Sequence, residues 1–512
     1  MKTVSASTAM RLALLPIAAL ALFYFLTAPK DGNFWWYDSS RHAMNGVFLR
    51  DLIMEGGLWH PVHFATIYVK QYPAVNIGFY PPFFYISSVP MLLLFGTSHA
   101  VSQSVVALYV LGLGALVWLI SRRVMDGFSA TATALATLAL APVALWSRQV
   151  QLDVPAVAIF FFTAYALIRH LESKQQAWMF AAAIALGIGV LTRVQGVFMV
   201  PVLLFFLFAR RYAEQPSFAR RSLAIVLAGL IALPAVVMVM YFQQVNQALA
   251  SATPGMPKLW SLENWAWYAE KLPQQIGWPA LAVTVVGLLA ALRLGWQKRL
   301  PLTVEVLGAC AACAWLFFTM VSNKDPRFNL PGVLFLFVVA AHGLYFTLPT
   351  LARILLPVLA AWLFFQLGVA GPVPEVNGFS TAVSATLAVT PKNANVLISA
   401  HRDGSFIYDL RTQGNRRDIG VRRADKLFVE LHIMRALGIR DRQLDKAAIL
   451  AMLDHEKVAT VVVQPGYLDD QPSIRSFLAL LEEGKYYDKV QTIAIQGSTD
   501  RNEHELVVYK RK

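Results

Sequence analysis

Apolar stretches that are long enough to cross a lipid bilayer recur along the first 370 residues of this chain and then stop. A helix needs about 20 predominantly apolar residues to cross the hydrocarbon core. Since a spanning helix satisfies its own backbone hydrogen bonds, this pattern predicts a bundle of membrane helices. We expect about eleven spans, near residues 10–28, 100–120, 128–146, 154–170, 177–192, 196–209, 223–242, 279–294, 302–321, 330–348 and 353–370.

The composition supports a polytopic α-helical membrane protein. Hydrophobic residues make up 57% of the chain and charged residues only 14%, whereas soluble domains carry about 25% charged residues. Residues 371–512 differ, because helical and strand patterns alternate there as in a soluble α/β domain. We predict a linker and a helix over 371–390, strands at 395–400, 458–464, 489–496 and 505–510, and helices at 425–437, 443–455 and 472–484.

The distribution of charge predicts the orientation of the spans. With the N-terminus in the cytoplasm, the cytoplasmic loops carry mainly basic residues, as the positive-inside rule requires. They hold Lys2, Arg11, Arg122, Arg123, Arg169, Lys174, Arg210, Arg211, Arg220, Arg221, Arg293, Lys298, Arg299 and Arg353, against Asp126, Glu172, Glu214 and Glu305. The loops at 29–99 and 243–278 and the soluble domain then lie outside, in the periplasm of a bacterial inner membrane. Topology accounts for the net charge of +14, so no nucleic-acid partner is expected.

One apolar segment complicates this orientation. Residues 83–96 are apolar enough to span, but a span there would place Arg122 and Arg123 outside and Asp153 inside. We therefore expect this segment to lie in, or dip into, the outer leaflet. The domains are then a transmembrane part at 1–370, whose first outer loop is 29–99, and a periplasmic domain at 371–512.

Near the start of the first outer loop, four residues, three of them Trp or Tyr and one Phe, precede the acidic residue Asp38. From Ser39 to Gly56, apolar residues recur at helical spacing, which predicts an amphipathic helix on the membrane with Ser39 and Ser40 as N-terminal caps. Asp38 then lies near the helix N-terminus, where it is either a cap itself or a catalytic carboxylate.

Other ionisable residues fall in the outer loops or near the outer leaflet. Ionisable groups at membrane depth are costly and generally mark function. Arginine suits a phosphate-bearing lipid because it grips oxygens through two donors, although a single basic residue can also be a snorkelling charge. The sequence predicts that Asp38 shares one outer-leaflet cavity with Arg148, Asp153, Arg193, Lys324 and Arg327.

These motifs resemble those of the GT-C membrane glycosyltransferases. The resemblance rests on the Asp after the first span, the Pro-Pro-Phe-Phe-Tyr stretch at 81–85, Ser147-Arg148 followed by Asp153-Val154-Pro155, Leu191-Thr192-Arg193, and the stretch 324–331. It covers about residues 1–350. The bacterial branch with the aminoarabinose lipid A transferases and the protein O-mannosyltransferase-like enzymes is the most similar.

The resemblance implies transfer of a sugar from a polyprenyl-phosphate carrier to a membrane or periplasmic acceptor. Asp38 matches the first-loop carboxylate that serves such enzymes as a base, and a carboxylate can take the proton of a hydroxyl. Asp153 is the second catalytic candidate. Basic residues stabilise the leaving phosphate, and one displacement inverts the anomeric centre. The phosphate candidates are Arg148, Arg193, Lys324 and Arg327, and the acceptor candidates are Tyr37, Arg41, Tyr80 and Tyr85.

The chain also departs from its relatives. Ser39 stands where many carry an acid, and Phe79 and Tyr80 stand where aminoarabinose transferases carry Glu-Lys. These departures weaken the case for a lipid A acceptor and for a metal site built on that Glu. A divalent cation remains one option for Asp153 or for the loop histidines His42, His60 and His63.

Two other functional classes remain open. One is a lipid or polysaccharide transporter, although no internal repeat of the kind common in transporters is evident. The other is a non-catalytic protein that binds polyprenyl phosphate. Cys310 and Cys313 form a C-x-x-C pattern inside an apolar helix. They predict packing, because a redox or metal role needs polar support.

Overall fold

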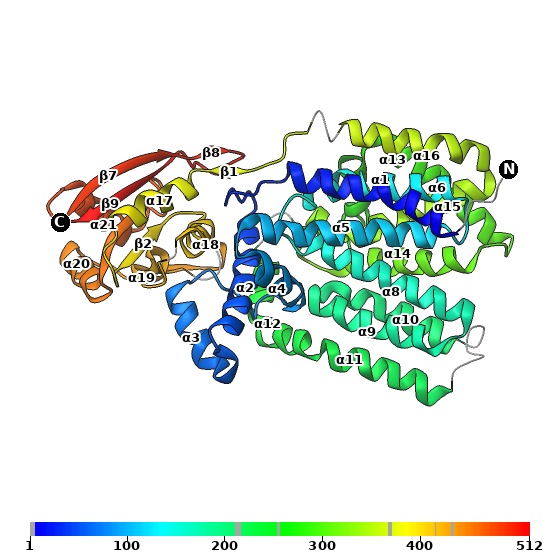
Figure 1. The fold of residues 1–512 in the computed structure, drawn as a ribbon, viewed down its shortest axis with the longest axis horizontal. Helices are drawn as coiled ribbons and strands as arrows, with labels where there is room; N and C mark the ends of the chain where they lie inside the picture. Colours follow the sequence, from blue (N-terminus) through cyan, green and yellow to red (C-terminus); the bar gives the residue numbers. More distant parts are fainter. Residues whose placement is uncertain (1–5, 210–216, 253–255, 367–370, 415, 432–434) are drawn as a thin grey trace. The chain divides into compact units, whose positions relative to one another are not determined.

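The computed structural model describes residues 6–209, 217–252, 256–366, 371–414, 416–431 and 435–512 (Figure 1). Several predicted features lie outside these residues: the charges at positions 2, 210, 211 and 214, the end of the last span at 367–370, and part of the helix predicted at 425–437. The chain divides into two compact units. The first is Met1–Thr27, Gly78–Phe84 and Val106–Pro372, and the second is Ala28–Ile77, Tyr85–Val105 and Val373–Lys512.

Helices make up the first unit, and all eleven predicted stretches contain helix. Within the described residues, six helices are long and apolar enough to span a membrane by length and composition: α5, α8, α11, α13, α14 and α15, the last counted with the short turn η3 before it. The helices are α1 (Ala6–Thr27), α5 (His99–Ser121), α6 (Gly127–Leu138), α7 (Ala141–Trp146), α8 (Asp153–Ser173), α9 (Gln176–Thr192), η2 (Val194–Met199), α10 (Val200–Phe208), α11 (Phe218–Tyr241), α12 (Gln243–Ala252), α13 (Leu262–Trp296), α14 (Leu302–Met320), η3 (Pro326–Asn329), α15 (Leu330–Thr347) and α16 (Pro349–Phe365).

Small residues let the helices of this unit approach closely. α13 packs along α15, and α9 packs between α8 and α11. A Cβ atom on Gly287 of α13 would collide with the backbone of Ala340, and one on Gly343 of α15 would collide with the backbone of Gly287. Close backbone approach through small residues is typical of membrane helix pairs.

The segment that we expected to dip into the outer leaflet forms a short helix. α4 (Phe83–Phe95) has 13 residues, which gives it a length of about 20 Å. The hydrocarbon core is about 30 Å thick, so α4 alone is too short to cross it. Its placement in the membrane stays a prediction.

The second unit contains an α/β domain, as predicted for the C-terminal residues. Its main sheet has the order β3-β2-β6-β9-β7, with β2 parallel to β3 and β6, and β9 antiparallel to β6 and β7. The elements are β1 (Val376–Asn377), α17 (Phe379–Val389), β2 (Asn395–Ser399), α18 (Asp403–Gln413), β3 (Gly420–Arg423), α19 (Ala424–Leu427), β4 (Val429–Leu431), η5 (Arg435–Leu437), β5 (Ile439–Asp441), α20 (Lys446–His455), β6 (Val458–Val463), α21 (Pro472–Glu482), β7 (Tyr487–Ala494), β8 (Gln496–Gly497) and β9 (Glu505–Arg511).

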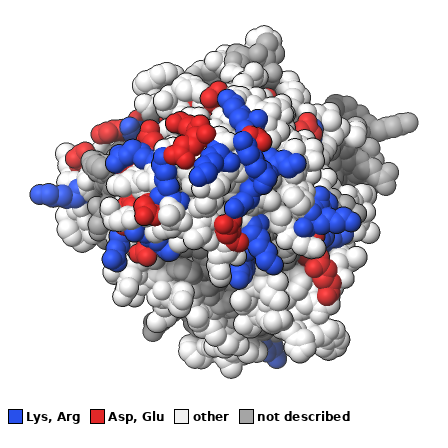
Figure 2. Space-filling view, turned by 90° about the vertical axis from the view of Figure 1, so that its left-hand side faces the viewer, with Lys and Arg blue, Asp and Glu red and all other residues white. Residues whose placement is uncertain are grey.

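The four predicted strands and the helices at 443–455 and 472–484 are confirmed. The helix predicted at 425–437 is wrong, because α19 ends at Leu427 and β4 pairs antiparallel with β5. The sequence analysis also missed α18 and β3. Basic and acidic side chains are intermixed on the face shown in Figure 2, as expected for a solvated surface.

Most of the first outer loop, residues 29–77 and 85–99, belongs to the same unit as the α/β domain. It forms α2 (Tyr37–Met54), η1 (Gly57–Trp59) and α3 (Pro61–Gln71), and α2 packs against α18. The predicted helix is therefore present, but its polar face is not simply solvated. Asn45 is fully buried and donates to Asn76 at 2.6 Å. Packing against α18 covers polar and apolar positions alike.

Candidate functional site

Asp38 lies in the first turn of α2 and is half-buried. Among the residues that the structure describes, its carboxylate has no hydrogen bond or ion pair. The N-cap residue is Trp36, whose side chain makes no capping hydrogen bond. The predictions that Asp38, Ser39 or Ser40 is the cap are therefore wrong, because the helix begins one residue before Asp38. A carboxylate in a first turn is still stabilised by the helix dipole.

The residues on either side of Asp38 are held by the α/β domain. The Tyr37 hydroxyl donates to Asp500 at 2.6 Å and lies 3.2 Å from a carboxylate oxygen of Glu503. Burial, and then the bond to Asp500, raise the pKa of Tyr37 well above its usual value. Arg41 donates to both oxygens of Asp403, at 2.9 and 3.2 Å. Asp38 is thus a free carboxylate between two anchored neighbours.

The two other predicted acceptor residues differ in their surroundings. Tyr85 is fully buried, and its hydroxyl lies 2.8 Å from Nδ1 of His42, which is also buried. Tyr80 belongs to the first unit and is half-buried, with its ring edge-on to Phe79 at 5.0 Å. Their roles toward an acceptor stay predictions.

In the first unit, the structure brings Asp153 and Arg193 together. Asp153 is the first residue of α8, and Arg193 is the residue at which α9 ends and η2 begins. α8 packs along α9, so the two side chains meet at one end of this helix pair and form an ion pair. Asp153 is buried, and Arg193 neutralises its charge.

Aromatic faces hold the two arginines of this region. The Arg193 guanidinium lies 5.5 Å from the ring centre of Phe328, and that of Arg327 lies 5.4 Å from the same ring. Arg327 also stacks over Trp146 at 5.5 Å. Three of the predicted site residues, Asp153, Arg193 and Arg327, therefore converge around Phe328. Stacking on a ring leaves the edge of a guanidinium available for an anion.

Lys324 has a different environment from the arginines. Its ammonium donates to the carbonyls of Phe318 at 3.3 Å, Thr319 at 2.9 Å and Val321 at 3.1 Å. These carbonyls lie at the C-terminal end of α14, where a cation is favourable. The three donors of the ammonium are therefore already used in holding a helix end.

Arg148 is buried, being 6% exposed, and packs over the rings of Phe23 at 5.4 Å and Tyr24 at 4.9 Å. Its Nε and Nη2 atoms have no hydrogen-bond partner among the described residues. Buried donors are nearly always paired, and a buried charge is unfavourable without a partner. An unpaired buried guanidinium therefore points to an anionic ligand.

No group of three potential metal ligands of the His, Cys, Asp and Glu types occurs within the described parts of the chain. His42 contacts Tyr85, whereas His60 and His63 are exposed. Cys310 and Cys313 are free thiols. The structure therefore offers no preformed metal site of this kind among these residues.

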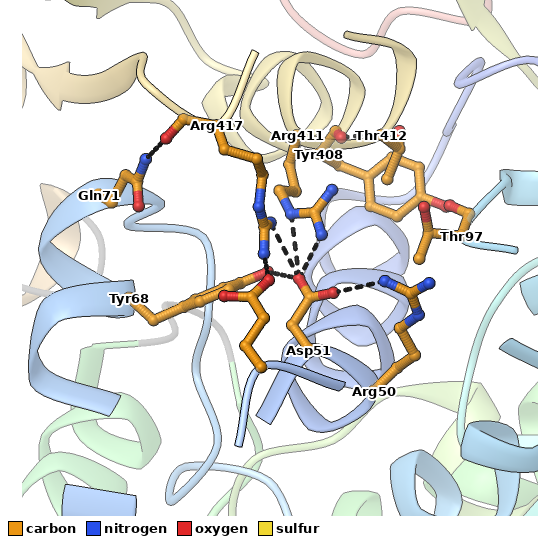
Figure 3. Close-up of polar contacts among 10 residues, drawn as sticks. Arg50, Asp51, Tyr68, Gln71, Thr97, Tyr408, Arg411, Thr412 and Arg417 are labelled. Carbon is orange, nitrogen blue, oxygen red and sulfur yellow. Dashed lines mark hydrogen bonds and ion pairs between the residues drawn. The ribbon is translucent and has the colours of Figure 1, made fainter. Parts of the chain in front are cut away.

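A buried ionic network that was not predicted from the sequence joins the first loop to the α/β domain (Figure 3). Asp51 is fully buried and accepts from Arg50 at 3.0 Å, Tyr68 at 2.6 Å, Arg411 at 2.5 Å and Arg417 at 3.2 Å. Burial alone would raise the pKa of Asp51, but the arginines, led by Arg411, hold it below its usual value. The density of arginines between 402 and 423 was the available signal.

Comparisons with known proteins agree with this architecture. A family model described as dolichyl-phosphate-mannose-protein mannosyltransferase matches residues 80–242. No curated protein matches the sequence at a significant level. ArnT from Cupriavidus metallidurans in the apo state is 16% identical with a TM-score of 0.62, covering 99% of this chain and 98% of that chain. The same enzyme bound to undecaprenyl phosphate gives 16% identity and a TM-score of 0.61, covering 97% of each chain.

At this level of identity, the likeness concerns the fold. It extends over both units, from the first helix to the last strand, and it agrees with the apolar helices of a multi-pass membrane protein. The chain therefore has the GT-C glycosyltransferase fold and resembles the ArnT and protein mannosyltransferase types of that class.

Proposed function

We propose that this protein transfers a sugar from a polyprenyl-phosphate carrier to a lipid, glycan or protein acceptor. The reaction takes place on the periplasmic side of a bacterial inner membrane. The ArnT structure with the same fold binds undecaprenyl phosphate, which supports this class of donor. The excess of basic residues in the loops assigned to the cytoplasm supports the orientation.

The observation that carries the proposal is the unpaired guanidinium of Arg148. It is buried on two aromatic rings and has two donor atoms without partners among the described residues. A phosphate oxygen would satisfy these donors and offset the charge. A sugar or other neutral ligand would leave the charge unpaired.

The cluster around Phe328 also supports a donor that carries a phosphate. Arg193 and Arg327 carry two positive charges, and each lies beside a carboxylate, Arg193 beside Asp153 and Arg327 beside Asp325 at 3.4 Å. The leaving group of the reaction is a phosphate, so fixed positive charge stabilises the transition state more than a proton donor would. In this proposal Asp153 orients Arg193. Lys324 contributes positive charge, but its N–H donors are already used by the carbonyls at the end of α14.

Asp38 acts as the general base. An acceptor hydroxyl is a weak nucleophile, and a positioned carboxylate takes its proton as the bond to the sugar forms. The carboxylate of Asp38 has no partner among the described residues, so it is available for this step. One in-line displacement breaks the bond to the carrier phosphate and inverts the anomeric centre.

The test is a transfer assay with the purified full-length protein in lipid nanodiscs. A panel of radiolabelled polyprenyl-phosphate sugars is combined with bacterial envelope extracts. We expect Arg148→Met to raise KM for the donor about tenfold or more, because a charge-assisted contact is lost. We expect Asp38→Asn to lower kcat by about 100-fold or more. Arg123→Gln, which breaks an ion pair with Glu172, is the control and should leave both constants unchanged.

Two outcomes would contradict the proposal at different points. If Asp38→Asn transfers sugar as fast as the parent, Asp38 is not the base. If the donors bind with an affinity that depends on Arg148 but no sugar is transferred to any acceptor, the protein is a non-catalytic carrier-binding protein.

A further inference from the structure

In the main sheet of the α/β domain, the chain passes from β2 to β3 on one side and then returns to β6 on the other side of β2. β3 lies on one side of β2 and β6 on the other, and both run parallel to it. Right-handed crossovers then place α18 and α20 on opposite faces of the sheet. In parallel α/β sheets, ligands bind at the carboxyl ends of the strands at such a switch point. Here these ends lead into Arg402 and Asp403 after β2, and into Asp425 after β3.

The start of α2 contacts these residues. The Arg402 guanidinium donates to the carbonyl of Trp35 and stacks over the ring of Tyr37 at 4.3 Å. A Cβ atom on Gly404 would lie only 2.7 Å from Oγ of Ser40. The first turn of α2 therefore lies against the carboxyl edge of the sheet, where a soluble α/β protein would hold a ligand.

Two buried ionic groups maintain this contact. The Arg402 side chain is 1% exposed and pairs at 2.9 Å with Glu503, which is fully buried. Asp403 accepts from Arg41 at 2.9 Å and pairs with Arg423 at 2.9 Å. A buried charge that loses its partner is strongly unfavourable. These pairs therefore hold the start of α2 in one position against the sheet.

We propose that the α/β domain is the positioning element for Asp38, and that Arg402 is its principal positioning residue. Arg402 holds the residues on both sides of the N-cap, Trp35 and Tyr37, and Asp403 holds Arg41 on the next turn. Asp38 lies between these anchors and keeps a free carboxylate. This inference rests on the role of Asp38 in the proposed function, and it gives the domain a part in the reaction without contact with the substrate.

The experiment uses variants of the full-length protein. Arg402→Met combined with Glu503→Gln removes both buried charges together, so that neither is left unpaired and the domain still folds. Arg41→Met removes the second anchor, while Asp403 keeps Arg423 as a partner. Arg435→Ala, which breaks the exposed pair with Asp470, is the matched control.

Two measurements are made on each variant. The first is hydrogen exchange at the amides of residues 41–46 in α2, with the amides of β6 as an internal reference for folding. We expect exchange in α2 to rise about tenfold or more in the anchor variants and to stay unchanged in the control. The second is transfer kinetics. We expect kcat to fall about tenfold or more with little change in KM for the donor, because misplacing a catalytic group affects kcat.

The outcomes separate this inference from the proposed function. Unchanged exchange in α2 overturns the anchoring, whatever the activity. Faster exchange with unchanged kcat overturns the positioning role. In an Asp38→Asn background the anchor variants should cause no further loss of kcat, and an equal further loss would show that Arg402 acts elsewhere. If Asp38→Asn is fully active, the base assignment fails, and the exchange data still decide whether the domain anchors α2.

Discussion

Single carboxylates in this protein differ more in their surroundings than in their sequence context. Asp38, Asp51 and Asp153 all lie within or next to apolar segments. In the structure Asp153 pairs with one arginine, and Asp51 contacts three. Of these three, only Asp38 has no partner among the described residues. A free carboxylate suits proton transfer, whereas a paired one suits orientation and stability.

The Asp51 network should show strong coupling in a double-mutant cycle. Removing one partner leaves a buried charge uncompensated, so we expect Asp51→Asn or Arg411→Met alone to destabilise the unit by about 3 kcal/mol or more. The double variant should cost less than the sum, with a coupling of about 1–3 kcal/mol. Thermal and denaturant unfolding in detergent measures these values. The exposed pair Arg435–Asp470 is the control, with an expected coupling below about 1 kcal/mol.

Asp409 gives a prediction of pH dependence. It is buried in α18, and its Oδ2 has no partner in the described chain. Burial, and then the charge of Asp31, raise the pKa of Asp409 well above its usual value. The folded state therefore binds this proton more tightly than the unfolded state, and this residue lowers stability progressively as the pH rises above about 4.

Asp409→Asn should remove this effect, because the amide stays neutral. We expect a gain of about 1 kcal/mol or more at pH 8 and a much smaller gain at pH 4.5, measured by thermal unfolding. The exposed residue Asp488 provides the control, since Asp488→Asn should change stability little at either pH. A gain of equal size at both pH values would show that Asp409 is not protonated in the folded protein.

At the scale of elements, two helix breaks lie beside a predicted site residue and at a glycine that the backbone requires. α9 ends at Thr192, directly before Arg193, and α13 contains a non-helical residue, Gly277, with φ of 77° and ψ of 155°. Such angles are accessible to glycine but strained for residues with a Cβ. The break lies beside residue 279, where the hydropathy predicted that a span begins, but the backbone angles themselves come only from the structure.

Gly277→Ala should therefore destabilise the first unit by about 1–3 kcal/mol. Gly295→Ala in the last turn of the same helix is the matched control, because an added Cβ there meets no atom within 4 Å and the backbone is helical. We expect this control to be neutral or slightly stabilising. Thermal unfolding of both variants in detergent measures the difference, and equal stabilities would show that Gly277 carries no strain.

At the scale of the whole molecule, the first outer loop depends on the α/β domain for its core. Residues 28–77 and 85–105 form one compact unit with residues 373–512. Asp51 obtains two of its arginines from that domain, and α2 packs against α18. The loop and the domain therefore form one compact unit, although about 300 residues separate them in the chain.

A chain that ends at residue 372 should consequently lose the structure of its first loop. Without Arg411 and Arg417, Asp51 would be buried with only Arg50 beside it. We expect residues 37–71 to become the first site of limited proteolysis, while the apolar helices keep their circular dichroism signal. The full-length Lys446→Ala variant, which breaks an exposed pair, is the control. An intact first loop in the truncated chain would contradict the single unit.

Local patterns in the sequence determined much of this protein. Long apolar stretches predicted the membrane helices, strand patterns that alternate with helical ones predicted four strands of the soluble domain, and helical spacing predicted α2. These elements were predictable because the spacing of apolar residues within a short segment shows which of its faces are buried. The strand β4 was missed because it has three residues and gains its stability from pairing with β5.

Tertiary structure alone decided which charged residues meet. The sequence placed Asp38, Arg148 and Arg193 among the candidates, yet it could not show that Arg148 is unpaired, that Arg193 pairs with Asp153, or that Lys324 caps α14. It also could not show that Arg402 holds the start of α2. Ion pairs between distant residues depend on packing across the fold, and their strength depends on burial, which no local pattern reports.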